Sequence, residues 1–514
     1  MICQRVRILL ALSGLLALSV LARWNLVLHR PLAGYMDNED AASHILATNI
    51  AYSQTPWSVH RFLPIFTLGA DHDKNIDDLP TSSVHDKQGN FYYASFPPGA
   101  FMLPYLLLPP NPVWLRFFNM LLGVLAAAAL GLLAWACSRN LLASGCAAAV
   151  YLVAPEALKS HTISFWAHQV YAPLFVVQVY LFVFRRRSIA LPLLAFACCL
   201  LEWTAYIVAI AMVCVAIWEF SRSHNKEALG LAWRLALSTV TAGLILVSWY
   251  ALVAPSADYF SALRYRSGVR TATLSGFAML AGLYAVSLGP FLIPLAATTI
   301  ARLRCSAGSP WRCESSWLPV FVICIAAWAE NLVLTNHANQ YSFDRLKGVQ
   351  LAGLGVAWAV SQLSEAIGRR IFQTTLAAGV ASIAMFWWAY DYSQDFQSLE
   401  YSMHQRLGEV IRNTAPPDAI VMTNATVRGH TLFYAGRNVV ERGRPATSFA
   451  TVAYDVSVNA VRVRSISGRV PQEVATYRLG KLAPARSRFQ ELVLIACGKI
   501  DPRTVRQTLF GLPG

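Results

Sequence analysis

The run ILLALSGLLALSVLARWNLVL, residues 8–28, is apolar almost throughout. A transmembrane helix needs about 20 predominantly apolar residues, so this run is long enough to cross a bilayer. No cleavage site of the small-residue A-x-A type follows it, and we expect a retained first span rather than a signal peptide. Similar runs recur, and together they predict about eleven spans. Their ranges are 8–28, 113–136, 140–155, 166–184, 188–202, 203–219, 229–253, 273–300, 317–335, 348–364 and 372–390.

The composition supports a bilayer as the solvent for much of the chain. Of its 514 residues, 56% are hydrophobic and only 13% are charged, with a mean hydropathy of +0.45. Soluble globular domains are about one quarter charged. A fold this poor in charge would leave apolar surface in water, so we expect a polytopic α-helical membrane protein.

Charge and cysteine content exclude two other classes of protein. The net charge is +15, but no basic run is interleaved with aromatic residues as a nucleic-acid groove requires. We therefore expect no nucleic-acid partner. Most of the ten cysteines lie in apolar runs or in basic loops, and they indicate neither a disulfide framework nor a CxxC metal site.

Basic residues in alternate short loops predict the orientation. By the positive-inside rule these loops face the cytoplasm, which puts the N-terminus inside. The loop 29–112 and the tail 391–514 are then external. The loop residues used are Arg5, Arg7, Arg139, Arg185, Arg186, Arg187, Arg222, Lys226, Arg302, Arg304, Arg312, Arg369 and Arg370.

The tail 391–514 differs in character from the membrane region 1–390. It is polar, and the segments 419–422 and 492–496 are typical of short buried strands. A helix-like stretch at 406–412 ends before Pro416 and Pro417. We expect a small external α/β domain there.

An acidic cluster follows the first span. Asp37, Glu39 and Asp40 precede an apolar-periodic stretch that predicts a helix near the membrane surface. His44 lies one turn after Asp40, on the same helix face. A carboxylate in this place can accept a proton from an attacking hydroxyl, as a general base does. The alternative interpretation is helix capping within a solvated loop.

A second motif precedes the second span. Tyr93 is followed by Pro97 and Pro98, and the two prolines forbid a helix at that point. Tyrosines prefer the membrane interface, so the segment is typical of one that re-enters the interface. An ordinary junction between loop and helix is the alternative.

These landmarks resemble a known family by their order. Glu39-Asp40-x6-Ala47-x-Asn49-Ile50, then Tyr93-x-Ser95-x-Pro97-Pro98-Gly99, then Arg116-x-x-Asn119 is similar to the GT-C glycosyltransferases. Within them it resembles the bacterial branch of protein O-mannosyltransferases and the lipid A aminoarabinose transferase. The resemblance is clearest over residues 30–190. The chain departs from the family by inverting the Asp-Glu pair, which leaves open which acid is the base, and by placing Phe96 where a basic residue often precedes the prolines.

The resemblance implies further site residues. Relatives carry another acid in the second external loop, and Glu156 is the nearest candidate here, to position the acceptor or to stabilise a sugar cation. The alternative interpretation of Glu156 is an acid at a helix end near the membrane interface. His161 of this loop and His337 of a later one are candidates for positioning the acceptor. Glu202 and Glu330 lie at or near span ends, where ionisable groups are functional hypotheses.

A lipid-phosphate donor needs cations near the outer face of the membrane. Arginine can grip a phosphate at two points, and the cations would stabilise the charge of the leaving group. Attraction to anionic lipid headgroups is the alternative role. The candidates, which lie in two external loops, are Arg264, Arg266, Arg270, Arg345 and Lys347.

No cofactor is certain from the sequence. Asp71, Asp73, Asn75 and Asp77 supply oxygen ligands on alternate residues, as at the start of a calcium loop, and the three aspartates are the candidate metal ligands. The calcium-loop pattern fails because Ile76 and Ser82 stand where glycine and glutamate are required. A looser divalent-cation site is one interpretation, and a solvated acidic loop is the other.

The resemblance implies a hexosyl- or pentosyltransferase of the bacterial inner membrane with its active site facing the periplasm. It would move a sugar from a polyprenyl-phosphate donor to an external glycan, lipid or protein. A transporter or flippase for lipid-linked sugars is the alternative from another class, although transporters hold their acids near the membrane midplane. An oligosaccharide polymerase or ligase is the third hypothesis.

Overall fold

The computed structural model describes the helical region almost completely and the rest in part. The described residues are 2–29, 63–64, 83–87, 91–109, 111–163, 165–268, 273–305, 316–389, 399–416, 419–424, 434–441, 452–457, 460–465 and 472–478.

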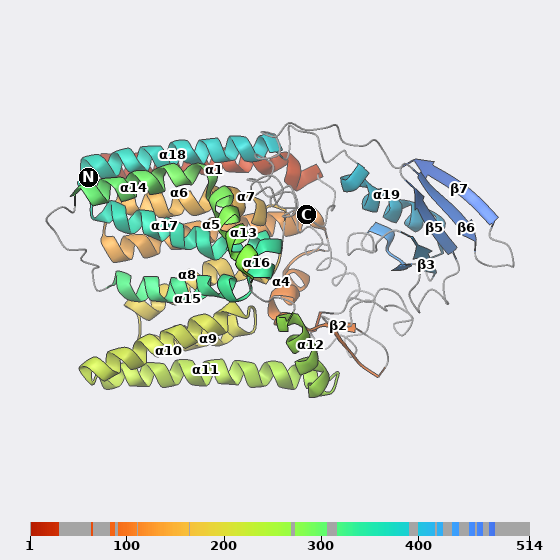
Figure 1. Cartoon of the computed structure of the whole chain (residues 1–514), viewed down its shortest axis with the longest axis horizontal. Helices are drawn as coiled ribbons and strands as arrows, with labels where there is room; N and C mark the ends of the chain where they lie inside the picture. The colour runs from red at the N-terminus through yellow and green to blue at the C-terminus, as the bar shows by residue number, and fades with distance from the viewer. Residues whose placement is uncertain are drawn as a thin grey trace.

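Long helices run side by side and form one bundle (Figure 1). The central helix is α6, which packs against α1, α5, α17 and α18. The bounds are α1 Ile2–His29, α4 Gly99–Leu107, α5 Pro112–Ser138, α6 Leu141–Val153, α7 Pro155–Ser160, α8 Ala167–Phe184, α9 Ala190–Cys199, α10 Thr204–Ser223, α11 Lys226–Ala251, α12 Ser256–Gly268, α13 Leu274–Leu288, η2 Gly289–Phe291, α14 Leu292–Cys305, α15 Trp317–Val333, α16 Thr335–Gln340, η3 Ser342–Arg345, α17 Leu346–Ser361, α18 Glu365–Trp387 and α19 Leu399–Thr414.

Each predicted apolar run coincides with described helices. Six helical segments in the described part are long and apolar enough to cross a membrane, and α6, α9 and α15 are shorter apolar helices. The number of spans and their orientation therefore stay predictions. The run 273–300 is interrupted by η2, where Gly289 has a φ of +41° and Pro290 follows it.

Local sequence explains where the helices begin and how closely they pack. Asn111 caps α5, whose first residue is Pro112, and Asn140 caps α6. Proline suits that first position because its missing N–H would have no partner there. At Gly353 of α17, a Cβ would lie 3.3 Å from the Ala147 carbonyl oxygen of α6. Small residues of this kind allow close approach of membrane helices.

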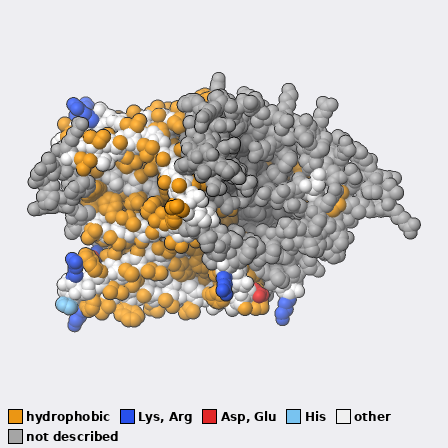
Figure 2. Space-filling view, viewed as in Figure 1, with side chains coloured by type: hydrophobic (Ala, Val, Ile, Leu, Met, Phe, Trp, Pro, Cys, Tyr) orange, Lys and Arg blue, Asp and Glu red, His pale blue; other side chains and the backbone are white. Residues whose placement is uncertain are grey.

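The surface of the bundle agrees with a lipid environment. Figure 2 shows hydrophobic side chains over its visible face, with Lys and Arg side chains mainly near its two ends. Long apolar side chains such as Leu132, Leu237 and Leu244 are more than half exposed. In water such a surface would promote aggregation, whereas in a bilayer it is the expected one.

A small sheet lies beyond the end of the bundle opposite the N-terminus (Figure 1). Its strand order is β4-β3-β5-β6-β7, with β3 parallel to β4 and β5 and the other pairs antiparallel. The bounds are β3 Ile420–Thr423, β4 Asn438–Glu441, β5 Val452–Ser457, β6 Ala460–Ser465 and β7 Gln472–Arg478. The expected strand near 419–422 and helix near 406–412 match β3 and α19, while 492–496 lies outside the described residues. The domain boundary at 390 stays a prediction.

Candidate functional site

Ionisable side chains gather inside the bundle near its end opposite the N-terminus, where the short helices α7 and α16 lie (Figure 1). All of them are buried, although membrane-buried charges are costly and are usually retained for function. We call this group, together with two hydroxyl side chains that donate to its carboxylates, the polar cluster. Its members are Glu156, His168, Glu202, Thr204, Ser287, Glu330, His337, Asp344, Arg345 and Lys347.

An ion pair between Glu156 and Arg345 joins α7 to η3. Nε and Nη2 of Arg345 donate to the carboxylate over 3.2–3.3 Å, and Nη1 donates to the Ala338 carbonyl at 2.6 Å. The Ser287 hydroxyl of α13 donates to the same carboxylate. Glu156 lies in the first turn of α7, where an acid suits the helix dipole. The sequence named both ends of this pair but did not connect them.

Asp344 lies between two histidines. His337 contacts one carboxylate oxygen, and Nε2 of His168 lies 2.7 Å from the other. Burial alone would raise the pKa of Asp344, but the facing imidazoles of His337 and His168 outweigh it and hold that pKa well below its usual range. Asp344 is therefore an anion at neutral pH. Its contact with His337 joins η3 to α16.

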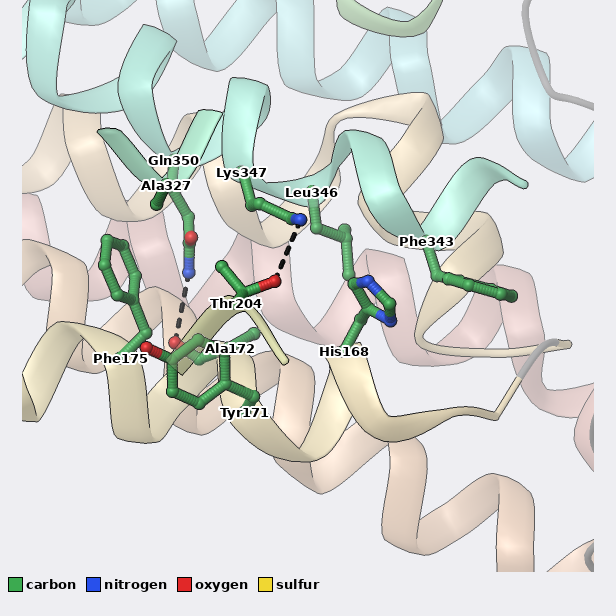
Figure 3. Close-up of a pocket in the computed structure, with 10 residues that line it drawn as sticks. All are labelled: His168, Tyr171, Ala172, Phe175, Thr204, Ala327, Phe343, Leu346, Lys347 and Gln350. Carbon is green, nitrogen blue, oxygen red and sulfur yellow. Dashed lines mark hydrogen bonds between the residues drawn. The ribbon is translucent and has the colours of Figure 1, made fainter. Parts of the chain in front are cut away.

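Lys347 belongs to a tight triad. Its Nζ lies 2.6 Å from Glu330 and 3.0 Å from the Thr204 hydroxyl, and that hydroxyl donates to Glu330 over 2.5 Å. Figure 3 shows Lys347 and Thr204 facing each other beside a small cavity, with His168 on its rim. The Lys347 ammonium and one oxygen of the Glu330 carboxylate thus have close partners. Such closure is typical of a group that holds helices together.

Glu202 connects the triad to the histidines. It lies in the turn between α9 and α10, with one carboxylate oxygen 3.4 Å from Nδ1 of His168. The boundary predicted at Glu202-Trp203 is therefore correct to within a few residues. The cluster holds four carboxylates, Glu156, Glu202, Glu330 and Asp344, against two cations, Arg345 and Lys347, so the two histidines decide its net charge.

The proline motif packs directly against this cluster. Phe96 contacts the rings of His168 and His337 at centroid distances of 5.7 and 6.1 Å. Pro97 and Pro98 are buried, and Pro98 caps α4. Tyr93 is buried too and stacks with Phe96. The aromatic ring at position 96 thus covers the two histidines, where relatives often have a basic residue.

His161 belongs to a separate network. Nε2 of its ring lies 2.9 Å from the Tyr151 hydroxyl, and Nδ1 lies 3.2 Å from the Asn119 carbonyl. These partners fit a neutral ring that accepts from the tyrosine and donates to the carbonyl. Burial, and then the nearby Arg23, lower the pKa of His161 to about 3. The neighbours of His161 thus suit a structural role.

Of the predicted residues whose side chains are described, Arg264 lies outside the cluster. Arg264 is exposed on α12, which packs against α11. The side chains of the other candidates lie outside the described residues. For Arg266 the backbone, on α12, is described but the side chain is not. These other candidates are Asp37, Glu39, Asp40, His44, Asp71, Asp73, Asp77, Arg266 and Arg270.

No three His, Cys, Asp or Glu side chains form a metal-binding group within the described ranges. Sequence reasoning missed the parts played by Thr204 and Ser287, whose hydroxyls are unremarkable within apolar runs. It named His337, Arg345 and Lys347 but not Asp344, which lies between them. The polar residues of 336–345, which stand between two apolar runs, were the available signal.

Comparison with solved structures identifies the architecture. The structure of ArnT from Cupriavidus metallidurans bound to undecaprenyl phosphate aligns with 87% of this chain and 92% of that chain, with a TM-score of 0.54 and 13% identity. This chain has the fold of that ArnT structure. An ArnT-like helical membrane fold, as expected from the order of the sequence motifs, is thereby confirmed, while the number of spans, their orientation and the external domain stay predictions.

Two further solved structures show a weaker likeness to this chain. An oligosaccharyltransferase from Archaeoglobus fulgidus, in complex with zinc and sulfate, aligns with 87% of this chain and 67% of that chain at a TM-score of 0.48 and 12% identity. ArnT from Cupriavidus metallidurans in the apo state aligns with 88% and 93% at a TM-score of 0.35 and 12% identity. The sequence itself matches no family model and no curated protein.

Proposed function

We propose that this chain is a membrane glycosyltransferase that takes its sugar from a polyprenyl-phosphate donor. The observation that carries the proposal is the buried guanidinium of Arg345 beside Glu156, within a GT-C fold whose solved likeness, ArnT, holds undecaprenyl phosphate. Arg345 is 5% exposed, so general attraction to lipid headgroups explains it poorly. Arginine at such a site suits two-point recognition of a phosphate.

The reaction we propose is a single displacement. Glu39 or Asp40 removes the proton from an acceptor hydroxyl, and the oxygen attacks the anomeric carbon of the sugar. The bond between that carbon and the phosphate oxygen breaks, and polyprenyl phosphate leaves with the bonding electrons. Arg345 stabilises the charge that develops on the phosphate. A single displacement inverts the anomeric configuration.

The polar cluster supports a division of labour among the predicted residues. Arg345 serves the donor phosphate, and the Ala338 carbonyl of α16 holds Arg345 in place, while the His337–Asp344 contact joins α16 to η3. Lys347, which the sequence assigned to the phosphate, is engaged by Glu330 and Thr204, so we assign it to the structure of the bundle. The acceptor is a glycan, lipid or protein on the periplasmic side of a bacterial inner membrane.

The acidic loop is tested by charge-removing variants. Purified protein is incubated with polyprenyl-phosphate sugars and a panel of acceptors, and transfer is compared among wild type, Glu39→Gln and Asp40→Asn. Loss of a general base costs about 10²–10⁴-fold in rate, so one variant should fall by that factor. Full activity in both variants would show that the base lies elsewhere.

The same preparation distinguishes the transporter hypothesis. In liposomes carrying a labelled lipid-linked sugar, the proposed enzyme consumes donor only when an acceptor is present. Movement of intact labelled lipid across the bilayer, with no donor consumed, would support a flippase instead.

A further inference from the structure

Arg345 presents two different edges to its surroundings. Nη1 is fixed by the Ala338 carbonyl at 2.6 Å. The opposite edge, formed by Nε and Nη2, faces the Glu156 carboxylate. This is the edge through which a guanidinium grips two oxygens of a carboxylate or a phosphate. Glu156 therefore occupies the place on Arg345 that suits a phosphate.

The contact between Glu156 and Arg345 is long for an ion pair. Its distances are 3.2–3.3 Å, whereas charge-assisted N–H···O bonds are typically about 2.7–2.9 Å. The neighbouring Lys347–Glu330 pair, at 2.6 Å, is as short as expected. Of the two pairs made by the lysine and the arginine of the cluster, that of Lys347 is tight and that of Arg345 is loose, and Arg345 is the residue that we assign to the donor.

Glu156 has a second partner that does not depend on Arg345. The Ser287 hydroxyl, from α13, donates to its carboxylate. A buried carboxylate that loses every partner is strongly destabilised, because the full cost of desolvation remains. With Ser287 in place, Glu156 can give up Arg345 and still keep a hydrogen bond.

The charges around Arg345 favour replacement of Glu156 by the phosphate over binding of the phosphate beside Glu156. In the structure one carboxylate, that of Glu156, faces the one guanidinium of Arg345. A phosphate placed beside Arg345 while Glu156 stayed bound would set two anions against one guanidinium in a buried site. Movement of Glu156 away from Arg345 lessens that repulsion and leaves one anion, the phosphate, at the guanidinium.

We infer that Glu156 is a placeholder for the donor phosphate, and that donor binding transfers Arg345 from Glu156 to the phosphate while Ser287 retains Glu156. The inference rests on the proposed function and adds to it a residue that sets donor affinity. The contact between Glu156 and Arg345 is a latch that donor binding must open. The fraction of molecules with an open latch scales the apparent affinity for the donor.

The test measures binding of undecaprenyl phosphate to the purified full chain in detergent, with the matching polyprenol, which lacks phosphate, as the reference ligand. Glu156→Gln removes the competing charge and should lower the Kd for undecaprenyl phosphate roughly tenfold, as expected if the latch is closed in about nine molecules of ten. Affinity for the polyprenol should not change. Glu156→Asp, which keeps the charge, should bind less tightly than Glu156→Gln.

A second variant, with the opposite expected effect on the affinity for undecaprenyl phosphate, keeps the test decisive if Glu156→Gln does not fold. Ser287→Ala removes the partner that holds Glu156 after release, so it should weaken binding of undecaprenyl phosphate. The matched control is Glu219→Gln, which breaks the ion pair between Glu219 on α10 and Arg186 in the loop after α8 and should leave the Kd unchanged.

Each outcome has a distinct meaning. If wild type prefers undecaprenyl phosphate over the polyprenol but Glu156→Gln binds equally or more weakly, the latch is wrong and the donor assignment survives. If Glu156→Gln does not fold, unchanged or tighter binding in Ser287→Ala overturns the latch. If wild type shows no preference for the phosphate, both the latch and the proposed function fail.

Discussion

His161 illustrates how a residue that looks functional in sequence is explained by its neighbours. It stands in a short polar loop near Glu156, and sequence alone made it a candidate for positioning the acceptor. In the structure its ring is buried and has a partner at each nitrogen, Tyr151 and Asn119. Arg23, itself buried, disfavours a second positive charge there. These contacts of His161 join α6, α5 and the end of α7, while its part in positioning the acceptor stays a prediction.

A pH dependence follows from this residue. The folded-state pKa of His161 is about 3, against 6.5 for the free side chain, so protonation favours the unfolded state. Its stabilising effect is fully present above pH 6.5 and is lost as pH falls toward 3, at up to about 1.4 kcal/mol per pH unit. As pH falls from 6.5 to 4.5, the thermal unfolding midpoint of wild type should therefore fall more steeply than that of His161→Gln. Parallel profiles for the two proteins would contradict the assignment.

At the scale of elements, the proline motif attaches the start of α4 to the turn between α9 and α10. The Gly99 amide donates to the Leu200 carbonyl at 3.1 Å, and the Trp203 indole donates to the Ser95 carbonyl at 2.7 Å. The start of α4 is thereby attached to the turn between α9 and α10, which carries Glu202. The sequence predicted a break before α4 from its two prolines. It could not show that Phe96 reaches two histidines that lie far along the chain.

The close approach at Gly99 leads to a stability prediction. A Cβ there would lie 2.7 Å from the Leu200 carbonyl oxygen, so Gly99→Ala must displace backbone. Overpacking of this kind costs about 1–3 kcal/mol, and the unfolding midpoint should fall. The control is Gly355→Ala in α17, where a Cβ meets nothing within 4 Å and alanine favours the helix by about 1 kcal/mol. Equal midpoints for the two variants would show that the motif is not docked as described.

At the scale of the whole molecule, sequence predicted the helices well because each lipid-facing helix must be a long apolar run. The break of α13 and α14 at Gly289 and Pro290 was missed, since both flanks are apolar. The site was only half predictable. Polar residues such as Glu156 and Arg345 stand out between apolar runs, but their pairing depends on how α7 and η3 pack. That packing belongs to the tertiary fold.

The central claim is that Arg345 handles the phosphate of a lipid-linked sugar donor. The most direct measurement is release of polyprenyl phosphate from a labelled polyprenyl-phosphate sugar by the purified chain with acceptor present, comparing wild type with Arg345→Gln and with the exposed-pair control Arg369→Gln. Loss of one such transition-state contact costs about 10²–10³-fold. The account predicts release by wild type and Arg369→Gln and a loss of that size in Arg345→Gln. Equal release by all three proteins, or none by wild type, would contradict it.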